Sequence, residues 1–276
     1  MPCHTPTVVR TATGESVLSR AIRIFDAFSV DEQALQVSEI ARRTQLHIAT
    51  ASRLIGELVA HGLLERGPDR EVRIGVRMWE LASRASPTLS LRDAAMPFLE
   101  DLHAVIGHHV QLGVMDGDQV LFIERLSARD AVVNYSRIAG RLPAHISSSG
   151  HVLLAYGPWE RLDRVLAAPL DGYTAHTITT ADDLRSALAK VRSQGFAMCP
   201  GHVHEDAAGI AVPVRNGLQE VVAALSVVVP NDDRLMAHAP LLMAAARGVT
   251  RALSTPRLVD GGPDRSQSMR GNSRLV

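Results

Sequence analysis

Apolar residues in the first sixty positions recur with the period of a helix. Every third or fourth position is apolar in residues 16–28, 38–43 and 48–61, which predicts three short helices. Ser38 is a candidate N-cap for the second helix, because its hydroxyl can accept a hydrogen bond from a backbone N–H group of the first turn. Gly62 is well placed to end the third helix, since glycine tolerates the left-handed backbone that often follows a helix.

Two short runs with the pattern of β-strands follow these helices. Residues 63–66 and 71–74 flank the segment Gly67-Pro68-Asp69-Arg70, whose glycine and proline favour a tight turn. The order of helix, helix, turn, helix and hairpin predicts a helix-turn-helix unit with a wing over residues 14–76. Residues 1–13, which are polar and rich in turn-forming types, are expected to be disordered.

In the remainder of the chain, segments with the helical spacing of apolar residues occur beside segments in which apolar and polar residues alternate, as in strands. The alternation of residues 110–114 and 120–126 about Asp116-Gly117-Asp118 predicts an antiparallel hairpin. Further strands are predicted at 132–138, 195–203, 209–214 and 220–229, and helices at 76–85, 91–106, 148–157, 159–167, 181–194 and 232–253. Strands grouped with helices predict an α+β domain over 77–256, followed by a disordered Gly-, Ser- and Arg-rich tail at 257–276.

Composition narrows the class of protein. The chain has 276 residues with 29 basic and 29 acidic side chains, so it lacks the basic excess of many nucleic-acid-binding proteins. Its two cysteines do not suggest a disulfide framework. The sequence shows neither an apolar run long enough to span a membrane nor a secretory signal, so we expect a cytoplasmic protein without a membrane partner.

The helix-turn-helix pattern leaves polar residues on the outer face of its second helix. Thr50, Ser52 and Arg53 lie near the start of that helix, the part that meets base edges in the major groove. The residues predicted to contact double-stranded DNA are Arg42, Arg43, Ala49, Thr50, Ser52, Arg53, Arg66, Arg70 and Arg73. Three-helix units with exposed arginines also occur in protein–protein modules, which remain the alternative.

The zero net charge hides a separation of charge in the first 76 residues. This segment has nine arginines and nine acidic residues. Glu15, Asp26, Asp31 and Glu32 precede the helix-turn-helix, whereas arginines gather on the predicted contact surface. The charge balance is therefore compatible with DNA binding that depends on specific contacts.

The segment 142–151 runs from a predicted strand into a predicted helix and contains three consecutive serines. A helix N-terminus offers unpaired N–H groups and a partial positive charge, which suit a carboxylate. Ser148 and Ser149 would add hydroxyl donors. Capping by one serine is the commoner reason for such a segment, so a small-molecule site and a simple cap both remain open.

A second cluster of reactive residues lies in the segment 199–206. On a strand, His202 and His204 would face the same side, and together with Cys199 they could bind zinc. A metal sensor or a metal-dependent enzyme is therefore the alternative function, set against the commoner case of a polar loop with solvated histidines. The nucleophile motif GxSxG and the glycine motifs of nucleotide sites are absent from the sequence, so we expect no enzyme.

Several segments resemble, in the same order, the IclR family of transcriptional regulators. The similarity extends from SVLSRAIRIFDAF and SEIARRTQLHIATASRLIGELVAHGLLER to GRLPAHISSSGHVLLAY and residues 195–230, and it covers about residues 14–255. It implies a winged helix-turn-helix, a linker helix and a C-terminal GAF-like α/β effector-binding domain with an antiparallel sheet. It also implies a homodimer or homotetramer that binds operator DNA, responds to a small-molecule effector and needs no cofactor.

The resemblance further implies where an effector would bind. The positions that match effector-contacting positions of the family are Asn134, Ser148, Ser149, Cys199, Gly209, Ser226 and Val228. The family often has an acid in place of Cys199, a cysteine in place of Gly209 and a serine in place of Val228. This pocket is thus expected to be less polar, and to take an organic acid larger or more apolar than a small oxo-acid, such as an aromatic acid.

The turn of the helix-turn-helix departs from the family pattern. The family usually has Gly-Leu-Pro where this chain has Gln45-Leu46-His47, and the next helix starts with the apolar pair Ile48-Ala49. Methyl groups of this pair can contact thymine, but they cannot donate a bidentate pair of hydrogen bonds. The operator is therefore expected to differ from typical ones, with sequence read by the polar side chains that follow.

Overall fold

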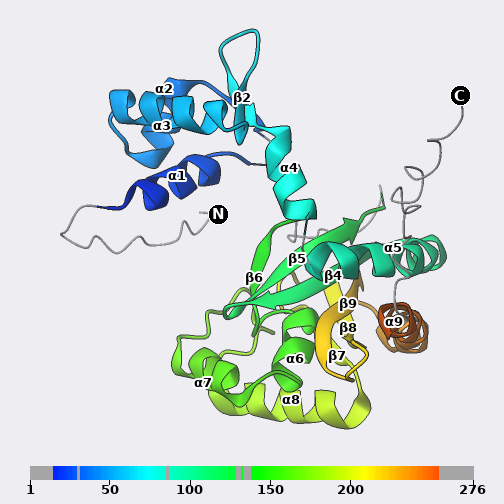
Figure 1. Ribbon diagram of the computed structural model, residues 1–276. Coiled ribbons are helices and arrows are strands. Elements are labelled where there is room, and N and C mark those ends of the chain that lie inside the picture. The colour runs from blue at the N-terminus through cyan, green and yellow to red at the C-terminus, as the bar shows by residue number, and fades with distance from the viewer. Residues whose placement is uncertain (1–14, 30–31, 85–86, 129–131, 133–137, 255–276) are drawn as a thin grey trace, which may run out of the picture. The chain divides into compact units, whose positions relative to one another are not determined.

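The computed structural model describes residues 15–29, 32–84, 87–128, 132 and 138–254. The chain divides into two compact units, Met1–Ser86 and Pro87–Val276, each of which has its own core (Figure 1). The ends expected to be disordered, 1–13 and 257–276, lie outside the described residues. Asn134 lies outside them too, as does the predicted strand 132–138 apart from its two end residues.

The first unit combines short helices with a small antiparallel sheet. Its elements are α1 (Val17–Asp26), β1 (Ala34–Leu35), α2 (Val37–Thr44), α3 (Ile48–Ala60), β2 (Leu64–Arg66), β3 (Val72–Ile74) and α4 (Val76–Ser83). The predicted hairpin is the antiparallel pair β2–β3, and β1 adds a third strand on the other side of β3. This confirms the winged helix-turn-helix, with one strand that was not predicted because two residues are too short to show a period.

Two of the predicted or expected helix ends in this unit agree with the capping rules, and one predicted cap does not form. Ser16 caps α1, because its hydroxyl accepts a hydrogen bond from the Ser19 N–H group at 3.0 Å. Gly62 follows α3 with a φ of 71°, as predicted. The prediction of Ser38 as an N-cap is wrong: α2 begins at Val37, because the chain enters the helix directly from the paired strand β1.

A buried apolar core holds the first unit together. Ile40 of α2 meets Leu54 and Ile55 of α3, and each of these side chains is almost completely buried. Leu64 and Val72 close the same core from the wing. Burying one such side chain contributes about 1.5–3 kcal/mol, so the helical spacing that predicted the elements also supplies their packing.

The second unit is a six-stranded antiparallel sheet between two layers of helices. Its strands, in spatial order, are β6 (Arg141–Pro143), β5 (Gln119–Leu126), β4 (His109–Asp116), β9 (Val221–Pro230), β8 (Ala207–Arg215) and β7 (Ala197–Pro200). Its helices are α5 (Pro87–Ile106), α6 (Ser148–Ala155), α7 (Trp159–Ala167), α8 (Ala181–Gln194), the 3-10 helix η1 (Leu235–His238) and α9 (Ala239–Ser254). The predicted mixed domain with an antiparallel sheet is confirmed.

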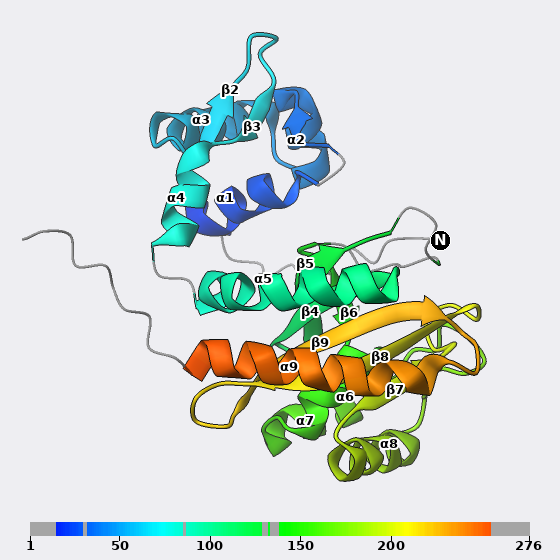
Figure 2. The same cartoon turned by 90° about the vertical axis from the view of Figure 1, so that its right-hand side faces the viewer.

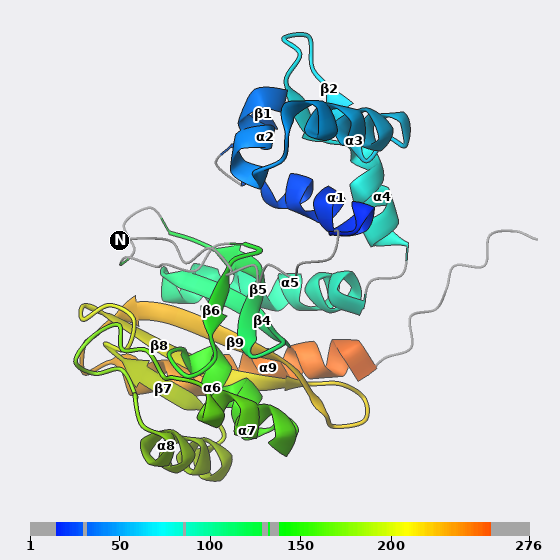
Figure 3. The same ribbon diagram turned by 90° about the vertical axis from the view of Figure 1, so that its left-hand side faces the viewer.

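Opposite faces of this sheet carry different helices. The long helices α5 and α9 lie side by side on one face, and α6 and α8 lie on the other (Figures 2 and 3). Because successive strand residues point to opposite faces, Leu225 of β9 packs in the core under α5 and α9, while its neighbour Ala224 packs under α6 and α8. Ser226 therefore faces the α6 side as well.

The start of α5 differs from the prediction. A helix was predicted from residue 91, but α5 begins at Pro87. Proline suits the first position of a helix, since its missing N–H group would have no partner there and its φ is already helical. Pro87 therefore opens the helix ahead of its predicted start.

Candidate functional sites

The start of α3 presents a mixed polar and apolar surface. Ala49, Ser52 and Arg53 are exposed there, whereas Thr50 is half-buried. The Arg53 guanidinium contacts Glu57 one turn later, with Nη1 2.7 Å from Oε1. Both side chains are more than half exposed, and exposed pairs of this kind are weak, so Arg53 can turn toward another partner.

The turn before α3 holds a residue in the left-handed region. Gln45 has a φ of 54° and a ψ of 29°, a conformation that costs a residue with a Cβ atom about 1–2 kcal/mol. His47 then caps α3, as its Nδ1 accepts a hydrogen bond from the Ala49 N–H group at 3.3 Å. The glycine usual in the family adopts this conformation without that cost, so the departure at Gln45 lowers the stability of the turn.

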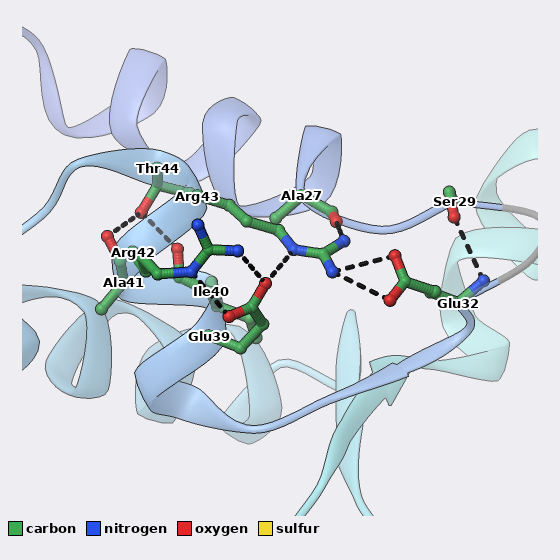
Figure 4. A network of polar contacts seen from close by, with 9 residues as sticks. All are labelled: Ala27, Ser29, Glu32, Glu39, Ile40, Ala41, Arg42, Arg43 and Thr44. Atoms are coloured by element: carbon green, nitrogen blue, oxygen red, sulfur yellow. Dashed lines mark hydrogen bonds and ion pairs between the residues drawn. The ribbon is translucent and has the colours of Figure 1, made fainter.

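Arg43 ties three segments of the first unit together (Figure 4). Its guanidinium lies 2.6 Å from the Glu39 carboxylate and 2.8 Å from that of Glu32, and it donates to the carbonyl oxygen of Ala27 at 3.1 Å. Arg42 contacts the same Glu39 carboxylate at 2.7 Å, but its side chain is 73% exposed. Arg43 is therefore engaged within the protein, whereas Arg42 keeps most of its surface for another partner.

This network predicts a pH dependence of stability. Hydrogen bonds from Arg42 and Arg43 lower the pKa of Glu39 from 4.5 to about 2. A carboxylate whose pKa is lowered by folding stabilises the folded state above pH 4.5, and this contribution is lost as the pH falls toward 2. We expect Glu39→Gln to lower the thermal unfolding midpoint at neutral pH, and the difference from the unmodified protein to shrink below pH 4.5.

Circular dichroism melts at a series of pH values test this expectation. The control is Asp26→Asn, since Asp26 is exposed and forms no ion pair with any residue that the structure describes. Its effect on the midpoint should be small at every pH. A Glu39→Gln difference that stays constant down to the acid limit of folding would contradict the role given to this carboxylate.

The wing carries three exposed arginines. Arg66 and Arg73 lie on its two strands, and Arg70 lies in the turn that joins them. Arg73 is 4.0 Å from Glu71, while Arg66 and Arg70 form no ion pair within the described part of the chain. Unpaired exposed guanidinium groups suit contacts with phosphate, because they have no intramolecular partner to give up.

A pocket in the second unit lies between the start of α6 and the sheet. It is lined by six of the seven residues predicted to contact an effector, namely Ser148, Ser149, Cys199, Gly209, Ser226 and Val228. Strand register brings the last four together: Cys199 pairs with Gly209, which pairs in turn with Val228 two residues after Ser226. The seventh, Asn134, lies outside the described residues.

Buried serines make one end of this pocket polar. Ser147 caps α6, with its Oγ accepting from the Gly150 N–H group at 3.0 Å. Ser149 donates through its Oγ to that of Ser226 at 2.9 Å, which links α6 to β9. Capping is therefore confirmed for Ser147, and all three serines line the pocket at this helix start. That the pocket binds a small molecule stays a prediction.

The rest of the pocket is mainly apolar. Lining residues that were not predicted for it are Gln111, Phe122, Leu142, Ile146, Ser147, Val203, His204 and Ala207. The described lining includes no arginine or lysine. A Cβ atom at Gly209 would lie 2.8 Å from the Ser148 hydroxyl, so the glycine leaves space beside that serine. The alternation along β4 does not indicate that Gln111 lines a pocket. Its pairing with Ser226 on β9 brings it to this position.

The predicted zinc cluster of Cys199, His202 and His204 is not the one that the fold assembles. Gly201, with a φ of 70°, turns the chain out of β7, so the two histidines do not alternate along one strand. His204 is half-buried in the following loop and lines the pocket. His202 folds back and joins Cys199 and His151 of α6, with one candidate ligand atom from each residue, and these atoms lie within 4.8 Å of one another.

Burial keeps this second cluster uncharged at neutral pH. It lowers the pKa of both His151 and His202 to about 4, and it raises the pKa of the Cys199 thiol. His151 Nε2 lies 2.8 Å from the carbonyl oxygen of His145. A carbonyl can only accept, so Nε2 carries the proton and Nδ1, 3.5 Å from the Cys199 sulfur, has a lone pair.

Comparison with protein families matches both units. A model of the IclR helix-turn-helix domain matches residues 17–68, and one of the C-terminal domain of the bacterial transcriptional regulator IclR matches residues 84–255. The HTH-type transcriptional regulator XynR of Escherichia coli (strain K12) is 31% identical, over 87% of this chain and 97% of its own. The Pca regulon regulatory protein of Pseudomonas putida is 25% identical, over 86% of this chain and 83% of its own.

Solved structures agree with these matches. An IclR homolog from Microbacterium hydrocarbonoxydans, crystallised as a complex with 4-hydroxybenzoate, is 43% identical with a TM-score of 0.82, over 86% of this chain and 99% of that chain. An IclR homolog from Microbacterium sp. strain HM58-2 is 40% identical with a TM-score of 0.59, over 88% of this chain and 100% of that chain. With both domains present in order, this protein belongs to the IclR family of DNA-binding transcriptional regulators, which are not enzymes.

Proposed function

We propose that this regulator binds operator DNA as a homodimer or homotetramer and responds to an aromatic acid held between α6 and the sheet. The pocket itself carries this proposal, because buried serines at a helix N-terminus lie beside an apolar lining. Such a site suits a ligand with a carboxylate at one end and an apolar ring at the other. A ligand can change DNA binding only through its different affinity for the two arrangements of the protein.

The carboxylate would be held by neutral donors. The first N–H groups of α6 have no partner within the helix, and the helix dipole places a partial positive charge at them. The hydroxyls of Ser148 and Ser149 lie at the same place. Without an arginine or lysine in the described lining, a small and highly hydrated oxo-acid gains little here, so much of the affinity must come from apolar contact.

The apolar contact is available for a ring. Phe122, Leu142, Ile146 and Val228 line the pocket, and the missing side chain of Gly209 widens it beside Ser148. Burial of apolar surface contributes about 25 cal/mol per Å², which favours a benzene ring over the methyl group of pyruvate. The complex of the 43% identical homolog with 4-hydroxybenzoate supports this ligand class.

Calorimetric titration of the full chain tests the ligand class. We expect 4-hydroxybenzoate or benzoate to bind at least about tenfold more tightly than pyruvate or glyoxylate. Ser148→Ala should weaken aromatic-acid binding by roughly tenfold or more, as it removes a hydrogen bond to a charged group. Ser193→Ala, which changes an exposed serine of α8, is the control. Tight binding of the oxo-acids, with none of the aromatic acids, would refute the proposal.

The DNA contacts would be of two kinds, contacts with base edges and contacts with phosphates. Ala49, Thr50, Ser52 and Arg53 at the start of α3 would meet base edges, with Thr50 half-buried and so limited in reach. The exposed arginines Arg42, Arg66, Arg70 and Arg73 would neutralise phosphates. Arg43, also predicted to contact DNA, would reach it only by giving up its contacts with Glu39, Glu32 and Ala27.

The cellular location follows from this DNA-binding role. Access to the bacterial chromosome requires that a transcriptional regulator of this family work in the cytoplasm. Among the residues that the structure describes, no helix is long and apolar enough to span a membrane.

A further inference from the structure

We propose that His151, Cys199 and His202 form a binding site for a single Zn²⁺ ion at the wall of the pocket. The three ligand atoms, two imidazole nitrogens and one sulfur, lie within 4.8 Å of one another. All three side chains are more than nine-tenths buried. This site does not depend on the proposed aromatic effector, and its test uses the metal alone.

One edge of the site already has the spacing of zinc ligands. His151 Nδ1 lies 3.5 Å from the Cys199 sulfur. In a tetrahedral zinc site, with Zn–S of about 2.3 Å and Zn–N of about 2.0–2.1 Å, a sulfur and a nitrogen ligand lie about 3.6 Å apart. The ion therefore fits between these two atoms, and the imidazole of His202 needs to approach by at most about 1.5 Å to complete the third position.

The orientation of His151 is the one that a metal ligand needs. Its Nε2–H group donates to the carbonyl oxygen of His145 at 2.8 Å, so the lone pair on Nδ1 points at the site. Metal-binding histidines commonly donate their other ring N–H to a backbone carbonyl, which holds the tautomer and the ring. The hydrogen bond from Nε2 to the His145 carbonyl oxygen already holds His151 in this way.

His202 is a buried histidine with one ring nitrogen that has no hydrogen-bond partner among the described residues. Its side chain is only 8% exposed, and its Nδ1 is buried without a hydrogen-bond partner among the described residues. An unpaired buried nitrogen costs free energy, and a bound cation would remove that cost. The ring lies edge-on to that of His151, with 5.8 Å between centroids.

The loop that carries His202 is held in place by the neighbouring segment. Thr177 donates its hydroxyl to the carbonyl oxygen of His202 at 2.6 Å, and Thr174 does the same to that of Gly201 at 2.6 Å. The Gly201 N–H group also donates to the carbonyl oxygen of Ala207 at 2.9 Å. A ligand on a backbone with these contacts is preorganised for its partner instead of being free to swing away.

Zinc suits this donor set better than magnesium or calcium, which take oxygen ligands. Binding converts the Cys199 thiol to a thiolate: the S–H bond breaks, the Zn–S bond forms and one proton passes to the solvent. Cys199 also lines the pocket, which gives the ion a route to the buried site. The three protein ligands leave a fourth tetrahedral position for water, as in zinc sites that keep an open position.

Titration of the metal-free full chain with Zn²⁺ and with Co²⁺, without any organic acid, tests the site. We expect one equivalent to bind, about one proton to be released, and Co²⁺ to give the near-ultraviolet absorption of a cobalt–thiolate bond. Cys199→Ser should abolish that absorption and weaken Zn²⁺ binding by more than about 100-fold, and His202→Gln should weaken it to a similar degree.

His204→Gln is the matched control, since it changes a histidine of the same loop outside the cluster and should leave metal binding unchanged. Absence of the cobalt–thiolate absorption in the unmodified protein would overturn the proposal whether or not the variants fold. Equal binding by Cys199→Ser would show an adventitious ion only, and loss of binding in His204→Gln would favour the cluster predicted from sequence.

Discussion

Replacing Gly150 by alanine is expected to destabilise the second unit by about 3 kcal/mol or more. An added Cβ atom would lie 2.0 Å from the carbonyl oxygen of Ala144 and 2.5 Å from its Cα. Both are backbone atoms, so no side-chain rotation can relieve the overlap, and the α6 start must move away from the strand-to-helix loop. That movement would displace Ser148 and Ser149, and ligand binding should be lost along with stability.

Chemical and thermal unfolding measure this effect. A loss of about 3 kcal/mol in a protein of this size lowers the thermal midpoint by roughly 6–12 °C. Gly217→Ala is the matched control, because a Cβ atom there has only ordinary contacts of 3.8 Å or more, and its effect should stay within about 0.5 kcal/mol. An unchanged midpoint for Gly150→Ala would mean that the loop and helix do not approach as closely as described.

Arg53→Ala is expected to weaken operator binding by roughly 5- to 150-fold, the range for loss of one base contact of about 1–3 kcal/mol. The side chain is exposed at the start of α3, and its partner Glu57 is an exposed carboxylate on the same helix. Giving up such a pair costs little. If Arg53 meets phosphate instead of a base, the loss will be similar for all sequences, and the salt dependence will fall by about one charge.

Fluorescence anisotropy with DNA from upstream of the protein's own gene, at several salt concentrations, measures both outcomes. Glu57→Gln is the matched variant: it leaves Arg53 in place, removes its partner and takes a negative charge from the DNA-facing surface. Its affinity should rise. Unchanged affinity of Arg53→Ala would remove this residue from the contact surface, and a fall for Glu57→Gln as large as that of Arg53→Ala would point to a structural role for the pair.

Local pattern predicted most elements of the first unit because its core is built from neighbours in sequence. Ile40, Leu54 and Ile55 recur at helical spacing, and the same spacing buries them. The errors occurred where a distant partner decided the local structure. β1 exists because β3 lies beside it, and that pairing moved the start of α2 ahead of Ser38.

The role of Arg43 shows the same limit. Its sequence position, beside Arg42 at the end of α2, suggested a DNA contact equal to that of its neighbour. The fold brings Glu32 and the Ala27 carbonyl oxygen against its guanidinium from outside the helix. Arg42 and Arg43 are consecutive residues, yet Arg42 is available to a partner and Arg43 holds the unit together.

The sequence by itself determined the succession of elements, the family and the serine segment at the start of α6, since these depend on residue types and short spacings. Tertiary structure alone decided which side chains meet. Strand register placed Gln111 opposite Ser226, and the turn at Gly201 paired His202 with His151 instead of His204. The physical reason is that pairing and turns join residues far apart in the chain, and no local period records which strand or helix will lie alongside.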